Sequence, residues 1–176
     1  MILDKWLVPT LRALLECACN ELADTPGGPV GRRSLLHSNV PVTDGCDCGC
    51  DASNAGLACD CPDGARGRVY VRVPRGQARA DLLADANVCL PDGWNMTAYI
   101  GVSRCVPNCR AEGATDGEED HMAFLGLNDL LALRRAVRCC GTKVPAQVGV
   151  QAWDWTALGP EGCCYGGELG VIVRVP

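Results

Sequence analysis

The chain has 176 residues, of which 48% are hydrophobic and 21% charged, and its formal net charge is −5. This length can bury one hydrophobic core, so we expect a single domain over residues 1–176. No apolar run approaches the roughly 20 residues of a membrane-spanning helix, the N-terminus lacks the pattern of a secretory signal, and the acidic excess disfavours a general nucleic-acid binder.

The first predicted element is a helix within residues 3–23. Leucines recur there at intervals of three and four residues, which places an apolar stripe along one helical face. Proline in a helix interior costs a hydrogen bond, so we expect the helix either to begin near Pro9 or to kink there. Cys17 and Cys19 belong to this helix, and we do not expect both to face the core.

Residues 24–65 show no hydrophobic period and are rich in glycine, proline, aspartate and cysteine. We interpret this segment as a long cysteine-rich loop. Structureless loops longer than about 15 residues are uncommon in compact domains unless they have a function or are cross-linked. The sequences CDCGCD (46–51) and CDCPDG (59–64) offer such cross-links.

Four strands are predicted from alternating apolar and polar residues. They cover residues 68–73, 96–103, 147–157 and 168–175. In the first of them the valines are expected to face the core, and the arginines and Tyr70 to face outward. Each strand thus has one apolar face, as in a half-buried sheet.

A second helix is predicted between the second and third strands. Leu127, Leu130, Leu133, Val137 and Cys140 recur at intervals of three and four residues. Acidic residues precede these leucines and arginines follow them, an order that the helix dipole favours. The whole pattern predicts an α+β domain: a mainly antiparallel four- to five-stranded sheet, two main helices and the long cysteine-rich loop.

Fourteen cysteines are the most unusual feature of the composition. Structural zinc sites use cysteines separated by two to four residues, or cysteine with histidine. No Cys-x-x-Cys occurs here, although Cys105 and Cys109 have a three-residue gap. Zinc is therefore not favoured; if it is bound, the expected ligands are Cys46, Cys48, Cys59 and Cys61. Disulfides and buried thiols are the alternatives. The candidate disulfide cysteines are Cys46, Cys48, Cys50, Cys59, Cys61, Cys89, Cys105, Cys109, Cys139, Cys140, Cys163 and Cys164.

Catalytic motifs are missing from the sequence. Neither His37 nor His121 lies near a nucleophile motif, and the sequence contains no Gly-x-Ser-x-Gly, no His-Glu-x-x-His and no glycine-rich phosphate loop. The acidic run at residues 118–120 has the composition of a solvated helix start. We therefore expect no catalytic residues, no cofactor and no enzymatic activity.

Aromatic residues on the predicted strands suggest an interaction surface. Strict alternation would place Trp153 and Trp155 on one strand face beside Gln151, either covered by the chain itself or presented to another subunit. The candidate interface residues are Trp153, Trp155, Tyr99 and Arg72.

Four short pieces of the sequence resemble a known family. They are WLVP at residues 6–9, VSRCVP at 102–107, LRRAVRCC at 133–140 and GPEGCCYGGE at 159–168, the last before a valine-rich strand. Together they resemble the neck and tail-terminator proteins of siphophages, bacteriophages that here would infect actinobacteria. The resemblance covers most of the chain outside residues 24–65.

This resemblance implies a small α+β virion protein without catalytic residues or a required cofactor. As a tail terminator it would form a homohexameric ring on the last ring of the tail tube, stop tube polymerisation and join the tail to the head-side connector. The expected partners are further copies of itself, the tail tube protein, the head-side connector or stopper protein, and genome DNA that passes through the lumen without specific binding. No membrane is involved.

The expected location is the tail or neck of the virion, after assembly in the host cytoplasm. Disulfides would then form once the particle reaches an oxidising medium. Two alternatives stand beside the terminator: a head-completion or stopper protein of the same head-tail joint, and a cysteine-rich zinc-binding interaction module.

Overall fold

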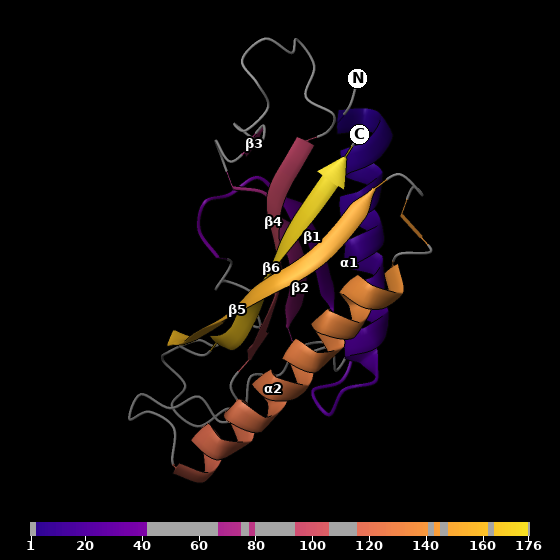
Figure 1. Ribbon diagram of the computed structural model, residues 1–176. Coiled ribbons are helices and arrows are strands. Elements are labelled where there is room, and N and C mark those ends of the chain that lie inside the picture. The colour runs from indigo at the N-terminus through magenta and orange to yellow at the C-terminus, as the bar shows by residue number, and fades with distance from the viewer. Residues whose placement is uncertain are drawn as a thin grey trace.

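The computed structural model describes residues 3–41, 67–74, 78–79, 94–105, 116–140, 143–144, 148–161 and 164–175. These residues form two α-helices, a π-helical turn and one sheet (Figure 1). The elements are η1 (Leu3–Leu7), α1 (Val8–Ala23), β1 (Arg32–Leu36), β2 (Arg68–Arg72), β3 (Ala78–Arg79), β4 (Trp94–Cys105), α2 (Asp116–Cys139), β5 (Gly149–Glu161) and β6 (Cys164–Val175).

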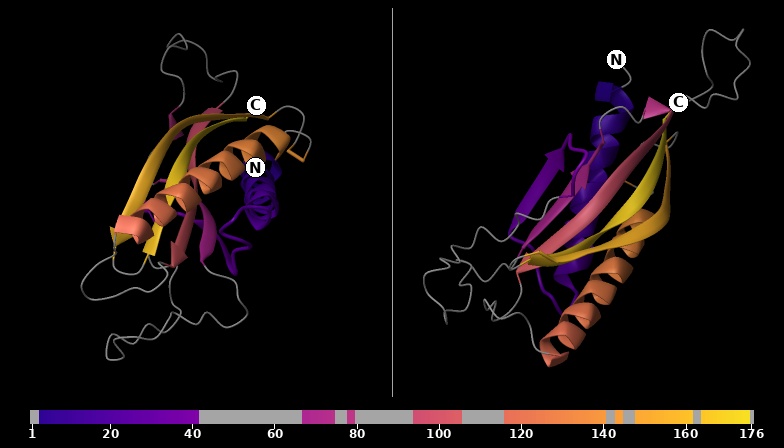
Figure 2. Two further views of the ribbon diagram at one scale, coloured as in Figure 1. Left: turned by 90° about the horizontal axis from the view of Figure 1, so that it is seen from below. Right: turned by 90° about the vertical axis from the view of Figure 1, so that its left-hand side faces the viewer.

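The strands form a mixed, mainly antiparallel sheet in the order β1-β2-β4-β6-β5, and the two-residue β3 pairs with β4. Only the β1–β2 pair is parallel among these ladders. Both helices cover the same face of the sheet (Figure 2), which we call the helix face; the other is the open face. The expected α+β class with a mainly antiparallel sheet and two main helices is confirmed.

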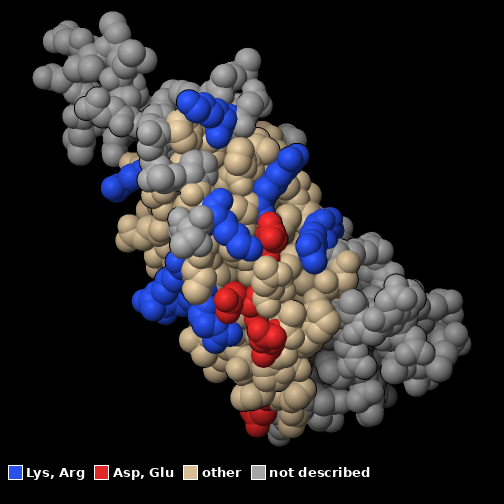
Figure 3. All heavy atoms as spheres, turned by 90° about the vertical axis from the view of Figure 1, so that its right-hand side faces the viewer, with Lys and Arg blue, Asp and Glu red and all other residues tan. Residues whose placement is uncertain are grey.

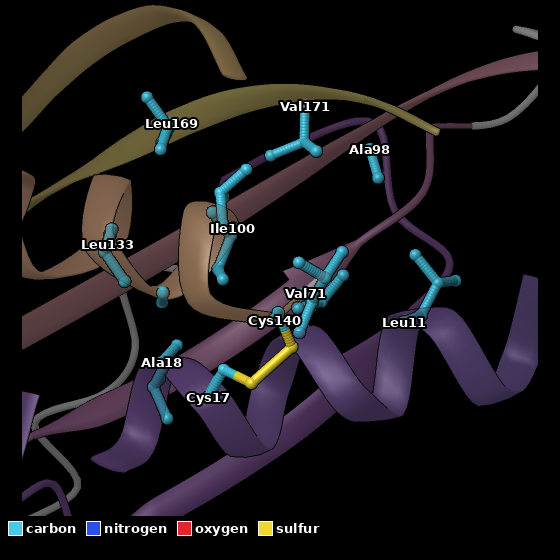
Figure 4. Close-up of a cluster of buried hydrophobic side chains, with 14 of the residues drawn as sticks. Leu11, Cys17, Ala18, Val71, Ala98, Ile100, Leu133, Cys140, Leu169 and Val171 are labelled. Atoms are coloured by element: carbon cyan, nitrogen blue, oxygen red, sulfur yellow. A yellow bond between two sulfur atoms is a disulfide. The ribbon is translucent and has the colours of Figure 1, made fainter. Parts of the chain in front are cut away.

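The hydrophobic core lies between the helices and the helix face (Figure 4). The alternation predicted for the central strands is confirmed, because alternate residues of β2, β4 and β6 are buried against the helices. The core residues of these strands are Val69, Val71, Ala98, Ile100, Val102, Leu169, Val171 and Val173. The helices contribute Leu11, Leu14, Ala18, Leu22, Leu133, Ala136 and Val137, among others.

Pro9 occupies the first turn of α1, directly after the π-helical turn η1. The first backbone N–H groups of a helix have no intrahelical acceptor, so a proline there costs no hydrogen bond. Of the two alternatives for this residue, the start of the helix is the one observed.

β1 lies within the segment that was expected to be a loop, so that prediction is wrong for Arg32–Leu36. The strand pairs in parallel with β2, with Arg32 opposite Arg68. Its sequence, RRSLL, has no strict alternation, and both Arg33 and Leu35 are exposed. β1 therefore forms through backbone pairing with β2, which is distant in the sequence, and the hydrophobic pattern of residues 32–36 does not predict a strand. The cysteine motifs at 46–51 and 59–64 lie outside the described residues.

Cys17 and Cys19 are both buried, which contradicts the expectation for α1. α1 packs against α2 as well as against the sheet, so its buried arc is wider than one stripe. Cys17 forms a disulfide with Cys140, the residue directly after α2, and this bridge lies within the core cluster (Figure 4). The candidate disulfide set included Cys140 but not Cys17.

Candidate functional site

The open face of the sheet carries a row of three of the four candidate interface residues. Arg72 of β2 lies opposite Tyr99 of β4, and Tyr99 lies opposite Gly170 of β6. The Trp153 indole of β5 covers Gly170, since a Cβ atom there would overlap the indole ring. Arg72, Tyr99 and Trp153 thus cross the sheet from β2 to its β5 edge.

Arg72 is buried on this face by specific polar contacts. Its Nε and Nη2 donate to Oε1 and Oε2 of Glu168 at 2.6 and 2.5 Å, and its guanidinium lies 4.1 Å from the Tyr99 ring centroid. The Tyr70 hydroxyl donates to the same Glu168 Oε1 at 2.7 Å. Tyr70 and Arg72 thus lie on the face of β2 opposite its valines, as the alternation predicts, but both side chains are buried there. Their polar atoms are satisfied by Glu168.

Arg72 remains a cation in this setting. Burial by itself lowers the pKa of Arg72, but the hydrogen bonds and charge of Glu168, together with Tyr70 and Tyr99, more than offset burial and raise the pKa above its ordinary value. The guanidinium, the Glu168 carboxylate and the two phenol rings form one charge-balanced cluster. Such a cluster of mutually satisfied polar groups can support a contact surface.

Glycine makes room for the aromatic ring of Tyr70. A Cβ atom at Gly101, directly opposite Tyr70, would overlap that ring. Any larger residue at position 101 would displace the phenol from Glu168. The glycine at this strand position is explained by the close approach of an aromatic side chain.

Trp155, the fourth candidate, does not lie on the open face. The β5–β6 register shifts between Ala152 and Trp155, so the two residues between them, Trp153 and Asp154, face the single residue Gly170. Trp155 then lies opposite Leu169 on the helix face and packs against the core. Trp153 stays on the open face with 57% of its surface exposed. The expectation that the two tryptophans share a face is wrong because of this bulge.

The helix face holds a second buried ion pair, which was not predicted from the sequence. Arg104 of β4 pairs with Asp129 of α2, and both side chains are buried. A signal for it was available: Arg104 continues the inward series Ala98, Ile100, Val102. Asp129 likewise interrupts the buried side of α2. This pair is part of the fold and not of a surface.

Among the described cysteines, Cys19 is a buried thiol. Burial raises the pKa of Cys19, an effect that the charge of Arg33 opposes and that of Glu16 reinforces, so the thiol stays protonated at neutral pH. Cys139 is exposed, and the β4–β6 register places Cys105 opposite Cys164. Within the described ranges, no three His, Cys, Asp or Glu residues gather as a metal site. Cys46, Cys48, Cys59 and Cys61, the expected zinc ligands, lie outside those ranges.

The outer surface of the helices carries interspersed charges of both signs (Figure 3). Arg135 of α2 pairs with Glu21 of α1 at 2.8 Å, and Lys143 pairs with Glu16 at 3.2 Å. This mixture of charges is typical of a solvated protein surface. Neither of the two helices is both long and apolar enough to cross a membrane.

Comparison of the chain with protein-family models gives no match, and comparison with curated protein sequences gives none either. Function is therefore inferred from the residues and surfaces of the chain itself.

Proposed function

We propose that this chain is a non-enzymatic virion structural protein, the tail terminator of a siphophage, which forms a hexameric ring on the end of the tail tube. The four sequence pieces quoted above support this assignment. The fold is compatible with it, since both helices cover one face of the sheet and leave the sheet edges for contacts between subunits.

The two unlike edges of the sheet carry the proposal. Among the described strands, β1 pairs only with β2, and β5 pairs only with β6. Strand edges present unpaired backbone groups that favour pairing with another chain. The β1 edge strand exposes Arg33 and Leu35, whereas the β5 edge strand exposes Trp153 and Asp154. A ring needs head-to-tail contacts between different surfaces, and two unlike edges at opposite ends of one sheet meet that requirement.

In this role the ring would cover the last ring of tail tube protein, stop further addition and present its other side to the head-side connector. The chain needs no catalytic group for these steps. Its formal charge of −5 makes an assembled ring strongly acidic, which disfavours adhesion of the DNA that passes through it.

A tube-capping assay tests the proposal. Purified tail tube protein is polymerised with and without this chain, and tube length and end structure are measured by electron microscopy. We expect short tubes that end in a hexameric ring of this chain. Trp153→Ala should reduce capping, whereas Gln151→Ala, at an exposed position on the same strand, should cap normally. Tubes of unchanged length without a bound ring would contradict the proposal, and binding to the head-side connector alone would favour the stopper alternative.

A further inference from the structure

The outer side of α2 exposes a row of large apolar side chains. Phe124, Leu127 and Leu131 have 53%, 61% and 53% of their surfaces exposed. They lie on the side of α2 that faces away from the core residues Leu133 and Ala136. In Figure 2, α2 is an outermost element of the molecule, with the sheet on one side of it only. Single exposed leucines are ordinary on protein surfaces, but a continuous apolar row indicates a contact.

The apolar row is the centre of a longer series with heptad spacing. Six exposed residues follow one another at alternating intervals of four and three, and we call them the α2 seam: Asp120, Phe124, Leu127, Leu131, Arg134 and Arg138. Intervals of four and three keep these side chains on one face of a helix that packs along another helix. The seam is acidic at its N-terminal end, apolar in the middle and basic at its C-terminal end.

Two copies of the α2 seam are complementary in charge when they run in opposite directions. When two α2 helices run antiparallel with Leu127 of one beside Leu131 of the other, Phe124 faces Arg134 and Asp120 faces Arg138. The twofold axis repeats each of these three contacts. The central leucines exclude water, the guanidinium of Arg134 lies over an aromatic ring, and the terminal charges attract each other. A parallel arrangement would instead place Asp120 beside Asp120 and Arg138 beside Arg138.

We propose that a second copy of this chain docks antiparallel along the α2 seam, forming a twofold dimer. The charge pattern favours a second copy as the partner. A surface complementary to the α2 seam carries basic, apolar and acidic residues in the opposite order, and the seam of a second, antiparallel copy has that order. The apolar centre is small compared with permanent interfaces, so the dimer should depend on concentration and weaken at high salt. The contact is independent of the proposed ring, which requires head-to-tail contacts through other surfaces.

Charge reversal at the ends of the seam tests the proposal. The wild-type chain, Asp120→Arg, Arg138→Asp and the double variant are compared by sedimentation velocity over a range of concentrations. We expect wild type to dimerise and each single variant to raise the dimer dissociation constant at least about tenfold, since like charges then meet at both ends of the seam. The double variant should dimerise as wild type does.

A mixture of the two single variants gives the sharpest result. In the mixed dimer the two substituted positions face each other with opposite charges at one end of the seam, and the native Asp120 faces the native Arg138 at the other end. An equimolar mixture should therefore dimerise at concentrations at which each variant alone stays largely monomeric. The control is Glu119→Arg, which makes the same charge change on an exposed residue outside the seam and should leave the dissociation constant unchanged. Thermal unfolding curves confirm that each variant is folded.

The proposal is overturned if wild type stays monomeric at every concentration, if both single variants dimerise as wild type does, or if the mixture stays monomeric. A failed tube-capping assay together with charge-dependent dimerisation would reject the terminator function alone. Normal capping by a chain that never dimerises would reject the α2 contact alone.

Discussion

Arg104 of β4 and Asp129 of α2 form a doubly hydrogen-bonded ion pair, with Nε–Oδ2 and Nη2–Oδ1 distances of 2.7 and 2.9 Å. The same guanidinium donates to the Gly27 carbonyl oxygen at 2.8 Å and to the Thr25 hydroxyl at 3.3 Å. One buried side chain therefore connects a central strand, the second helix and the turn that follows the first helix. Because the donors and acceptors are mutually satisfied, the pair is tolerated inside the core.

Replacement of Asp129 by asparagine should destabilise the fold strongly. The variant keeps the size of the side chain but leaves the charge of Arg104 buried without a counter-ion, which costs about 3–5 kcal/mol of unfolding free energy. Urea denaturation measures this loss. The matched control is Glu21→Gln, which breaks the exposed pair with Arg135 and should cost less than about 1 kcal/mol. Equal losses in the two variants would contradict the structural role of the buried pair.

The Arg72–Glu168 pair on the open face should behave as one unit. Arg72→Met and Glu168→Leu each leave one buried charge without its partner, and each should cost about 3–5 kcal/mol. The double variant removes both charges and should lose much less than the sum of the two single losses. A double-mutant cycle by chemical denaturation measures this coupling. Additive losses would mean that the two side chains do not act through each other.

The sequence predicted those helices and strands that have a clear hydrophobic period of their own. The alternation in β2, β4 and β6 identifies each strand together with its core face. The leucine spacing identifies α2 as a helix, but the first leucine of that series, Leu127, is 61% exposed and does not share the core face with Leu133. β1 was missed because Arg32–Leu36 forms a strand only through pairing with β2, a non-local interaction. Local periodicity does not report such pairing.

The candidate site was predicted only in part, for two physical reasons. One extra residue in β5 reverses the facing of the side chains after it, up to the second register shift between Leu158 and Glu161. Trp155 therefore lies on the helix face, while Trp153 stays on the open face. The alternation predicted that Arg72 and Tyr70 face outward but not that they are buried, because a sequence does not show that Glu168, almost 100 positions away, hydrogen-bonds to both. Burial of polar residues depends on such distant partners.

Loss of the Cys17–Cys140 disulfide should destabilise the protein. The bridge joins positions separated by 123 residues, and closing so long a loop in the unfolded chain contributes about 2–4 kcal/mol or somewhat more. Cys17→Ser and Cys140→Ser should each lower the free energy of unfolding by that amount. The double variant should lose little more than either single variant, since one bridge is lost in all three. Peptide mapping without reductant should recover the two cysteines as one cross-linked pair.

The raised pKa of Cys19 predicts a loss of stability in alkaline solution. Burial keeps this thiol protonated in the folded protein above its ordinary pKa of 9.0, whereas in the unfolded chain it ionises near that value. Above this pH the unfolded state releases a proton that the folded state retains, so the contribution to stability present below pH 9.0 declines as pH rises towards the folded pKa. Cys19→Ala should show a smaller decline over this range. Identical profiles of stability against pH in wild type and variant would show that Cys19 does not cause the alkaline loss of stability.

The two tryptophans of β5 should differ sharply in their effect on stability. Trp155 packs against the core on the helix face, but it is only partly buried, so Trp155→Ala should cost about 2–3 kcal/mol, below the roughly 3–5 kcal/mol of a fully buried tryptophan. Trp153 is more than half exposed, and Trp153→Ala should cost under about 1 kcal/mol. Chemical denaturation compares the two, and the fluorescence of the single variants separates a solvated indole from a packed one. If β5 had no bulge, both residues would lie on one face and the two losses would be similar.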